Sequence, residues 1–151
     1  MNKPDPIPAR LAALCSRGAA AGRLQHEGSV EVDGRRVDLD EVSEERPGQV
    51  FAFVMDTRWC ASALALARDA DLLVCEATFR TGEEDLAEEH GHLTAGQAAA
   101  LARAAGARRL VLTHFSQRHP DREGFADDAR PVFPEVIAAD DLTWVAVPPR
   151  R

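Results

Sequence analysis

Short apolar segments alternate with helix-forming stretches along most of the chain, and this alternation constrains the fold more than any other feature. Segments 50–55, 72–75 and 109–113 have the composition and length of buried strands. Helix-forming stretches occur at 60–69, 82–89, 95–105 and 122–130. Strands that alternate with helices pack as layers around one core. The sequence therefore predicts an α/β protein.

Local signals extend this prediction to the rest of the chain. Three prolines within residues 1–10 indicate a flexible N-terminal arm. The other predicted elements are a helix over 11–24, a hairpin over 30–39 that turns at Asp33-Gly34, and strands over 135–138 and 142–147. Thr94 and Gln97 have the spacing of a capping box, and Gly106 suits the end of the same helix. Residues 11–151 are expected to form one domain.

Composition indicates a globular protein and limits its partners. Of the 151 residues, 45% are hydrophobic and 28% are charged, which is not the balance of a disordered chain. The net charge of -7 argues against electrostatic binding of nucleic acid over the whole protein surface. A nuclease remains compatible with this charge, because metal ions can set the local field at an active site.

Cysteine usage and hydropathy indicate a cytoplasmic protein. The three cysteines are odd in number and form no Cys-x-x-Cys pair, so a disulfide framework is not expected. No segment approaches the length of about 20 apolar residues that a membrane helix needs. The polar, Pro-rich start lacks the apolar region of a signal peptide.

Acidic and imidazole side chains follow three of the predicted strands. Asp56, Glu76 and His114 each stand directly after an apolar segment, where α/β proteins gather their ligands. Taken singly, Asp56 is more often a helix cap, and His114 is more often a packed or capping residue. Together they make a ligand set suited to zinc. Spacing alone leaves a metal-dependent hydrolase and a structural role about equally open.

A fourth element lies at the start of the helix over 95–105. The run Gly91-His92-Leu93-Thr94 precedes this helix, where free N–H groups favour a bound anion such as phosphate. In this position His92 could donate a proton to a leaving oxygen. The alternative is that His92 and Thr94 only cap the helix.

Four motifs in order resemble those of ribonuclease Z, the tRNA 3′ endonuclease family of the metallo-β-lactamase superfamily. They are Val54-Met55-Asp56-Thr57-Arg58, Cys75-Glu76-Ala77-Thr78-Phe79, Gly91-His92-Leu93-Thr94-Ala95 and Leu112-Thr113-His114-Phe115-Ser116-Gln117-Arg118. The resemblance covers nearly the whole chain but only the C-terminal half of the family's length. It implies half of an αββα sandwich and an activity that removes the 3′ trailer from precursor tRNA.

The resemblance also implies roles for individual residues. Asp56 matches the aspartate that bridges two zinc ions, and His114 matches a histidine of the second zinc. His92 matches the histidine thought to act on the leaving 3′ oxygen, and Glu76 matches the glutamate that supports it. The implied substrate-binding groups are Thr57, Thr94, Ser116 and Arg118, although a solvated surface role suits Arg118 equally well.

The chain departs from the family pattern at three places. Met55 replaces the usual glycine before Asp56 and crowds the turn. Cys75 replaces a histidine, and as part of an apolar strand it is expected to be buried and inert. The family's His-x-His-x-Asp-His run and its next zinc histidine are absent from the sequence. The metal site is therefore incomplete, which leaves enzymatic activity of this chain uncertain.

Three interpretations follow from an incomplete site. The first is a ribonuclease Z-like fragment that needs a separate N-terminal half or a second copy of itself, because one half alone leaves an apolar sheet face open. The second is a related hydrolase of sulfate or phosphate esters. The third is a non-catalytic remnant or interaction module.

We expect the isolated chain to bind zinc weakly and to leave precursor tRNA uncleaved, because a catalytic zinc normally needs three protein ligands. A zinc titration followed by a cleavage assay on a precursor tRNA measures both properties. Efficient cleavage by the chain alone would contradict this expectation.

Overall fold

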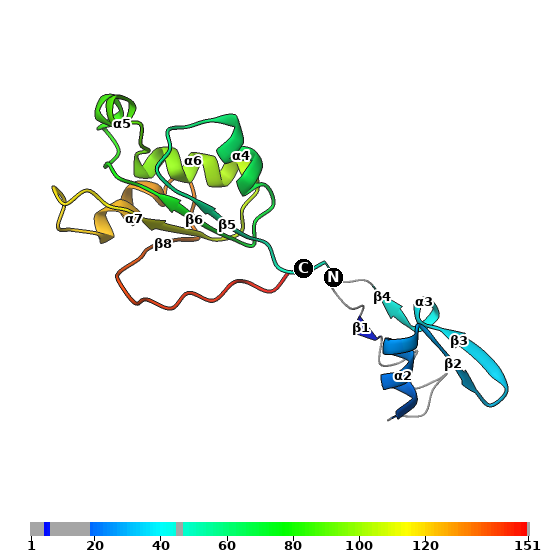
Figure 1. Ribbon diagram of the computed structural model, residues 1–151. Helices are drawn as coiled ribbons and strands as arrows, with labels where there is room; N and C mark the ends of the chain where they lie inside the picture. Colours follow the sequence, from blue (N-terminus) through cyan, green and yellow to red (C-terminus); the bar gives the residue numbers. More distant parts are fainter. Residues whose placement is uncertain (1–4, 7–18, 45–46, 151) are drawn as a thin grey trace. The chain divides into compact units, whose positions relative to one another are not determined.

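The structure is a computed structural model that describes residues 5–6, 19–44 and 47–150 (Figure 1). The chain divides into two compact units, residues 1–48 and 49–151, and each has its own buried hydrophobic cluster. Most of the predicted arm over 1–10 lies outside the described residues. The arm and the single domain over 11–151 therefore stay predictions.

The first unit is small and is organised around a hairpin. Its elements are β1 (Asp5–Pro6), α2 (Ala19–Glu27), β2 (Ser29–Val32), β3 (Arg35–Asp38), α3 (Leu39–Val42) and β4 (Ser43–Glu44). The predicted hairpin is confirmed: β2 and β3 pair antiparallel, and Asp33 and Gly34 both have positive φ, as this tight turn requires. The predicted helix over 11–24 is described only from Ala19, and it continues to Glu27.

The second unit is a parallel sheet with helices between its strands. Its elements are β5 (Phe51–Val54), α4 (Ala61–Ala67), β6 (Leu72–Glu76), α5 (Glu84–His90), α6 (Ala95–Ala105), β7 (Leu110–Thr113), α7 (Glu123–Ala129) and β8 (Val136–Ala138). The strands lie in the order β5-β6-β7-β8, and every neighbouring pair is parallel. This arrangement confirms the predicted α/β class. None of the helices in the described ranges combines the length and apolar character that a membrane crossing requires.

One face of the sheet carries the core. Ala52, Leu73 and Leu112 are buried among the side chains of α4, α6 and α7. The opposite face is also apolar, because the parallel register aligns Phe53, Val74, Val111 and Ile137 in one row across the four strands. Phe53 on the edge strand β5 is more than half exposed, as is Phe51 on the same strand. An apolar face left open at this edge agrees with the expectation from the sequence.

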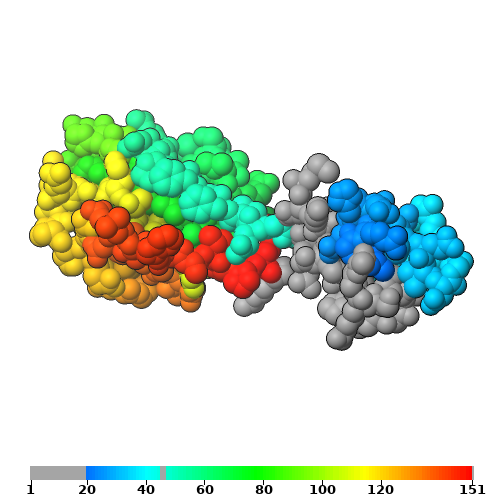
Figure 2. Space-filling model, turned by 60° about the horizontal axis from the view of Figure 1, so that its bottom comes forward, coloured from blue at the N-terminus to red at the C-terminus, as the bar shows by residue number. Residues whose placement is uncertain are grey.

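The predicted strand over 142–147 is wrong. After β8 the chain turns, with a hydrogen bond from Thr143 N to Asp140 O, and Leu142 takes a positive φ. The following carbonyls of Ala146 and Val147 accept hydrogen bonds from the Arg109 and Gln49 side chains instead of a neighbouring strand. Figure 2 shows this C-terminal segment, orange to red, lying across one face of its unit.

The start of α6 is fixed by side-chain capping. Thr94 Oγ1 accepts a hydrogen bond from Gln97 N, and Gln97 Oε1 accepts one from Thr94 N at 2.9 Å. Gly106 ends the helix in a left-handed conformation. The capping box and the glycine stop predicted from the sequence are both confirmed. Because residues 91–93 directly precede this cap, it also fixes where His92 can lie.

Removing the capping hydroxyl should destabilise the protein measurably. We expect Thr94→Ala to lower the free energy of unfolding by about 1 kcal/mol more than Thr94→Ser, because serine keeps the capping oxygen. Urea unfolding of both variants, followed by circular dichroism, measures the difference. Equal stabilities would show that the cap does not hold this helix end.

Candidate metal centre

The carboxyl ends of β5, β6 and β7 bring the sequence-predicted polar residues to one edge of the sheet. Asp56 lies two residues after the end of β5, Glu76 ends β6, and His114 follows β7 directly. In the parallel register, Glu76 pairs with Thr113, so His114 lies one step beyond Glu76 at the same edge. His92 reaches this edge from the loop between α5 and α6.

Asp56, His92 and His114 form one cluster. Each offers a ligand atom, and the three atoms lie within 4.8 Å of one another. His114 Nε2 is 3.3 Å from Asp56 Oδ1, and the rings of His92 and His114 are 5.3 Å apart at their centroids. The structure thus brings together the two residues predicted to bind metal and the histidine predicted to act as an acid.

Two members of the cluster have unusual backbone conformations. Asp56 has φ 48° and His114 has φ 61°, both in the left-handed region. For residues other than glycine this conformation costs on the order of 1–3 kcal/mol and is concentrated at functional sites. It turns the chain sharply at the end of each strand, where both side chains meet. Nothing in the sequence pattern predicts this geometry, beyond the tolerance of aspartate for it.

Glu76 is the buried centre of the site. Its side chain is 0% exposed, yet both carboxylate oxygens are fully used as hydrogen-bond acceptors. The donors are Thr57 N at 2.7 Å, His92 Nδ1 at 2.9 Å, Thr78 Oγ1 at 2.8 Å and Leu93 N at 3.1 Å. A buried carboxylate is stable only when it is paired in this way. Glu76 therefore connects the loop after β5, the loop after β6 and the segment before α6.

Thr78 connects Glu76 to His114. The Thr78 hydroxyl donates its proton to Glu76, so the Thr78 oxygen accepts a hydrogen bond from His114 Nδ1, 2.9 Å away. His114 therefore carries its proton on Nδ1 and directs the Nε2 lone pair toward Asp56. Sequence reasoning missed Thr78, although residues two apart in an extended segment project to the same side, as Glu76 and Thr78 do.

The same reasoning applies to His92. Its Nδ1 donates to the Glu76 carboxylate, which leaves Nε2 as the free ring atom. Two imidazole nitrogens and a carboxylate oxygen converging from oriented side chains form a donor set that suits zinc. Moreover, the His114 lone pair and the Asp56 oxygen are both acceptors at 3.3 Å, a contact that only a proton or a cation between them makes favourable. These residues fit a metal ion.

The structure places the four predicted substrate-binding residues in different surroundings. Ser116 and Arg118 line a pocket of about 280 Å³ together with His92, and Ser116 N donates to Thr78 O at 3.0 Å. Thr57 contributes its backbone N–H to Glu76, while its side chain faces a different pocket. Thr94 is fully buried in the cap of α6, so its side chain has no surface to offer a substrate.

Comparison with known families assigns the class. The model of the β-lactamase superfamily domain matches residues 23–115, a span that includes the whole cluster. The chain belongs to the β-lactamase superfamily, and its parallel sheet with covering helices is an α/β unit of the metallo-β-lactamase fold. Membership and the Asp56–His92–His114 cluster together point to metal ions.

Within this class the chain is similar to ribonuclease Z. It is 54% identical to ribonuclease Z of Salinispora arenicola over 146 residues and 56% identical to that of Streptomyces coelicolor over 147. These alignments cover 96% of this chain but 47% and 48% of the relatives. The chain therefore spans about half the length of the curated relatives it matches.

Solved structures give the same result. The short form of human tRNase Z superposes with a TM-score of 0.53 and 32% identity, covering 75% of this chain and 37% of that one. A metallo-β-lactamase fold protein from Bacillus subtilis gives a TM-score of 0.54 and 28% identity, covering 59% of this chain and 36% of that one. The predicted resemblance to the C-terminal part of ribonuclease Z is confirmed.

The two described cysteines differ sharply in chemistry. Ser62 Oγ, 3.1 Å from Cys60 Sγ, and the N–H of Ala63 stabilise the thiolate and lower the pKa of Cys60 to about 7. Burial, assisted by the neighbouring Glu76 carboxylate, raises the pKa of Cys75 to about 12. The prediction that Cys75 is buried is confirmed, and the third cysteine, Cys15, lies outside the described residues.

These pKa values predict selective labelling. In a Cys15→Ser background we expect iodoacetamide to modify Cys60 at a rate that rises as the pH passes through about 7, because only the thiolate reacts. Cys75 should stay unmodified until the protein is unfolded. Mass spectrometry after timed quenching measures both sites, and Cys60→Ser is the matched control. Labelling of Cys75 in the folded protein would contradict this assignment.

Proposed function

We propose that this chain provides one half of a zinc-dependent phosphodiesterase of the ribonuclease Z type, which removes the 3′ trailer from precursor tRNA. The observation that carries the proposal is the convergence of Asp56, His92 and His114 within 4.8 Å. The relatives named ribonuclease Z and the fold of human tRNase Z support the choice of substrate.

Each residue has a proposed part in the reaction. Asp56 and His114 would hold zinc, and their Oδ1 and Nε2 atoms lie 3.3 Å apart. Zinc supplies Lewis-acid chemistry when it is bound, because it lowers the pKa of water and polarises a phosphate. His92, once protonated at Nε2, donates that proton to the leaving 3′ oxygen, and the Glu76 carboxylate holds its ring through Nδ1.

The phosphate is proposed to lie over the pocket beside His92. Ser116 and Arg118 border this pocket, so a hydroxyl and a guanidinium are available to a phosphate oxygen. Arg118 N donates to Ser116 Oγ at 3.3 Å, which ties the two residues into one turn. The loop after β7 would then supply both the metal ligand His114 and the phosphate-binding groups.

The remaining ligands are proposed to come from elsewhere. The sequence contains no His-x-His-x-Asp-His run, so the full two-zinc site requires an N-terminal half, because a second copy of the chain would lack the same run. The exposed Phe51 and Phe53 on β5 belong to the apolar face that such a half would cover. We place the activity in the cytoplasm, where the free thiols of Cys60 and Cys75 are stable.

Complementation tests this proposal. We expect cleavage of a precursor tRNA 3′ trailer when the chain is coexpressed with the N-terminal half of the Salinispora arenicola relative and supplied with zinc. His114→Ala should lower the cleavage rate at least about 100-fold, because the second-metal site loses its ligand. Gel analysis of the trailer product measures the rate.

The controls separate a lost site from a lost fold. Asp127→Asn changes an exposed carboxylate on α7 and should leave the cleavage rate unchanged. Circular dichroism of His114→Ala checks that the sheet still forms. A well-folded pair of halves that leaves the precursor uncut, or that cuts equally well with His114→Ala, would refute the proposal.

A further inference from the structure

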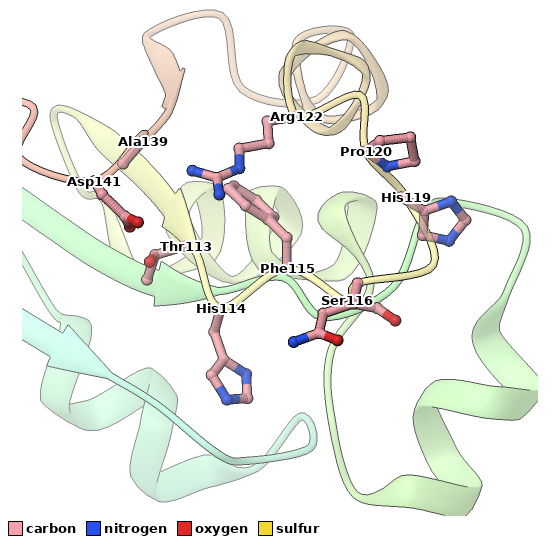
Figure 3. A pocket seen from close by; sticks show the side chains of 10 residues that line it. Thr113, His114, Phe115, Ser116, His119, Pro120, Arg122, Ala139 and Asp141 are labelled. Atoms are coloured by element: carbon pink, nitrogen blue, oxygen red, sulfur yellow. The ribbon is translucent and has the colours of Figure 1, made fainter.

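Another pocket of the second unit adjoins the candidate metal centre and, apart from His114 and Ser116 at its border, takes no part in the chemistry proposed above. It has a volume of about 490 Å³ and lies beyond the carboxyl ends of β7 and β8. His114 and Ser116 form its border with the metal centre, while Arg122 and Asp141 line it farther along (Figure 3). A volume of this size is within the range of small-molecule binding sites.

Two planar groups line this pocket. The Phe115 ring packs against Phe125, with 4.5 Å between centroids, and Phe125 is fully buried. Arg122 Nη1 donates to Asp140 Oδ1 at 2.8 Å in a solvent-exposed ion pair at the mouth of the pocket. Figure 3 shows the Arg122 and Phe115 side chains together in the pocket. Aromatic rings and guanidinium planes are the groups on which proteins stack unpaired bases.

Polar groups on other walls can read the edge of a base. Asp141 contributes a carboxylate, which when ionised only accepts hydrogen bonds. Gln117 contributes an amide that both donates and accepts. A carboxylate favours bases with an exocyclic amine, as in its pairing with the N4 amine of cytosine, and it disfavours the carbonyl of uracil at the same place.

We propose that this pocket binds a nucleobase that carries an exocyclic amine (adenine, cytosine or guanine, but not uracil) in the nucleotide next to the phosphate at the metal centre. The base stacks between the Phe115 ring and the Arg122 guanidinium, and its amine donates to Asp141. This inference rests on the proposed function, because it takes the ligand to be the RNA substrate of that centre. It adds a determinant of where the RNA is cut.

Nucleotide titration of the chain tests the pocket without any need for catalysis. AMP, CMP and UMP are added separately to the ¹⁵N-labelled chain, and amide shifts are followed by NMR. We expect AMP and CMP to shift resonances of residues 113–122 and 139–141, and to bind about fivefold more tightly than UMP, the value of one hydrogen bond. Asp141→Asn should remove this preference, whereas Asp127→Asn, an equal change of charge on α7, should keep it.

Four outcomes would overturn the pocket proposal: absence of binding, equal affinities for the three nucleotides, shifts confined to residues around His92, or an unchanged preference in Asp141→Asn. The complementation assay described above tests the proposed function separately. Cleavage that depends on His114 without nucleotide binding would reject the pocket alone, and nucleotide binding without such cleavage would reject the proposed function alone.

Discussion

The buried carboxylate of Glu76 is the interaction on which the site depends. It receives four hydrogen bonds, from two backbone N–H groups, a hydroxyl and an imidazole. An ionised carboxylate in the core would be strongly unfavourable without them. The three segments that supply these donors must therefore lie where Glu76 needs them. The same requirement places His92 and, through Thr78, His114, so the stability of this part of the core and the geometry of the cluster have one cause.

Much of this arrangement could be predicted from the sequence. Apolar segments followed by Asp56, Glu76 and His114 predict strands of an α/β protein whose ends gather these side chains. The neighbouring parallel strands β5, β6 and β7 bring the three residues to one edge. The capping box of Thr94 and Gln97 predicts where α6 begins and therefore where the loop before it ends. These predictions succeed because they depend on local composition and on the regular geometry of strands and helices, both of which are visible in a single sequence.

The finer geometry could not be predicted in this way. The left-handed conformations of Asp56 and His114 follow from packing around the strand ends, and no residue type there requires them. The hydrogen bond from Thr78 to Glu76 depends on a side-chain rotamer. The segment over 142–147 has the apolar pattern of a strand, but a turn after β8 takes its backbone away from the sheet. Each case depends on tertiary contacts that override local preference.

The positions of the ring protons on His92 and His114 help to distinguish a metal-binding role from a purely structural one. Glu76 and Thr78 together fix the tautomers of His92 and His114, so two Nε2 lone pairs and the Asp56 oxygen face one another. Such convergence of acceptors is unfavourable by itself, and strained backbone at Asp56 and His114 adds to its cost. Structural roles such as helix capping require neither feature. A cation would balance the repulsion between these acceptors, which favours a metal-binding role for the cluster over helix capping.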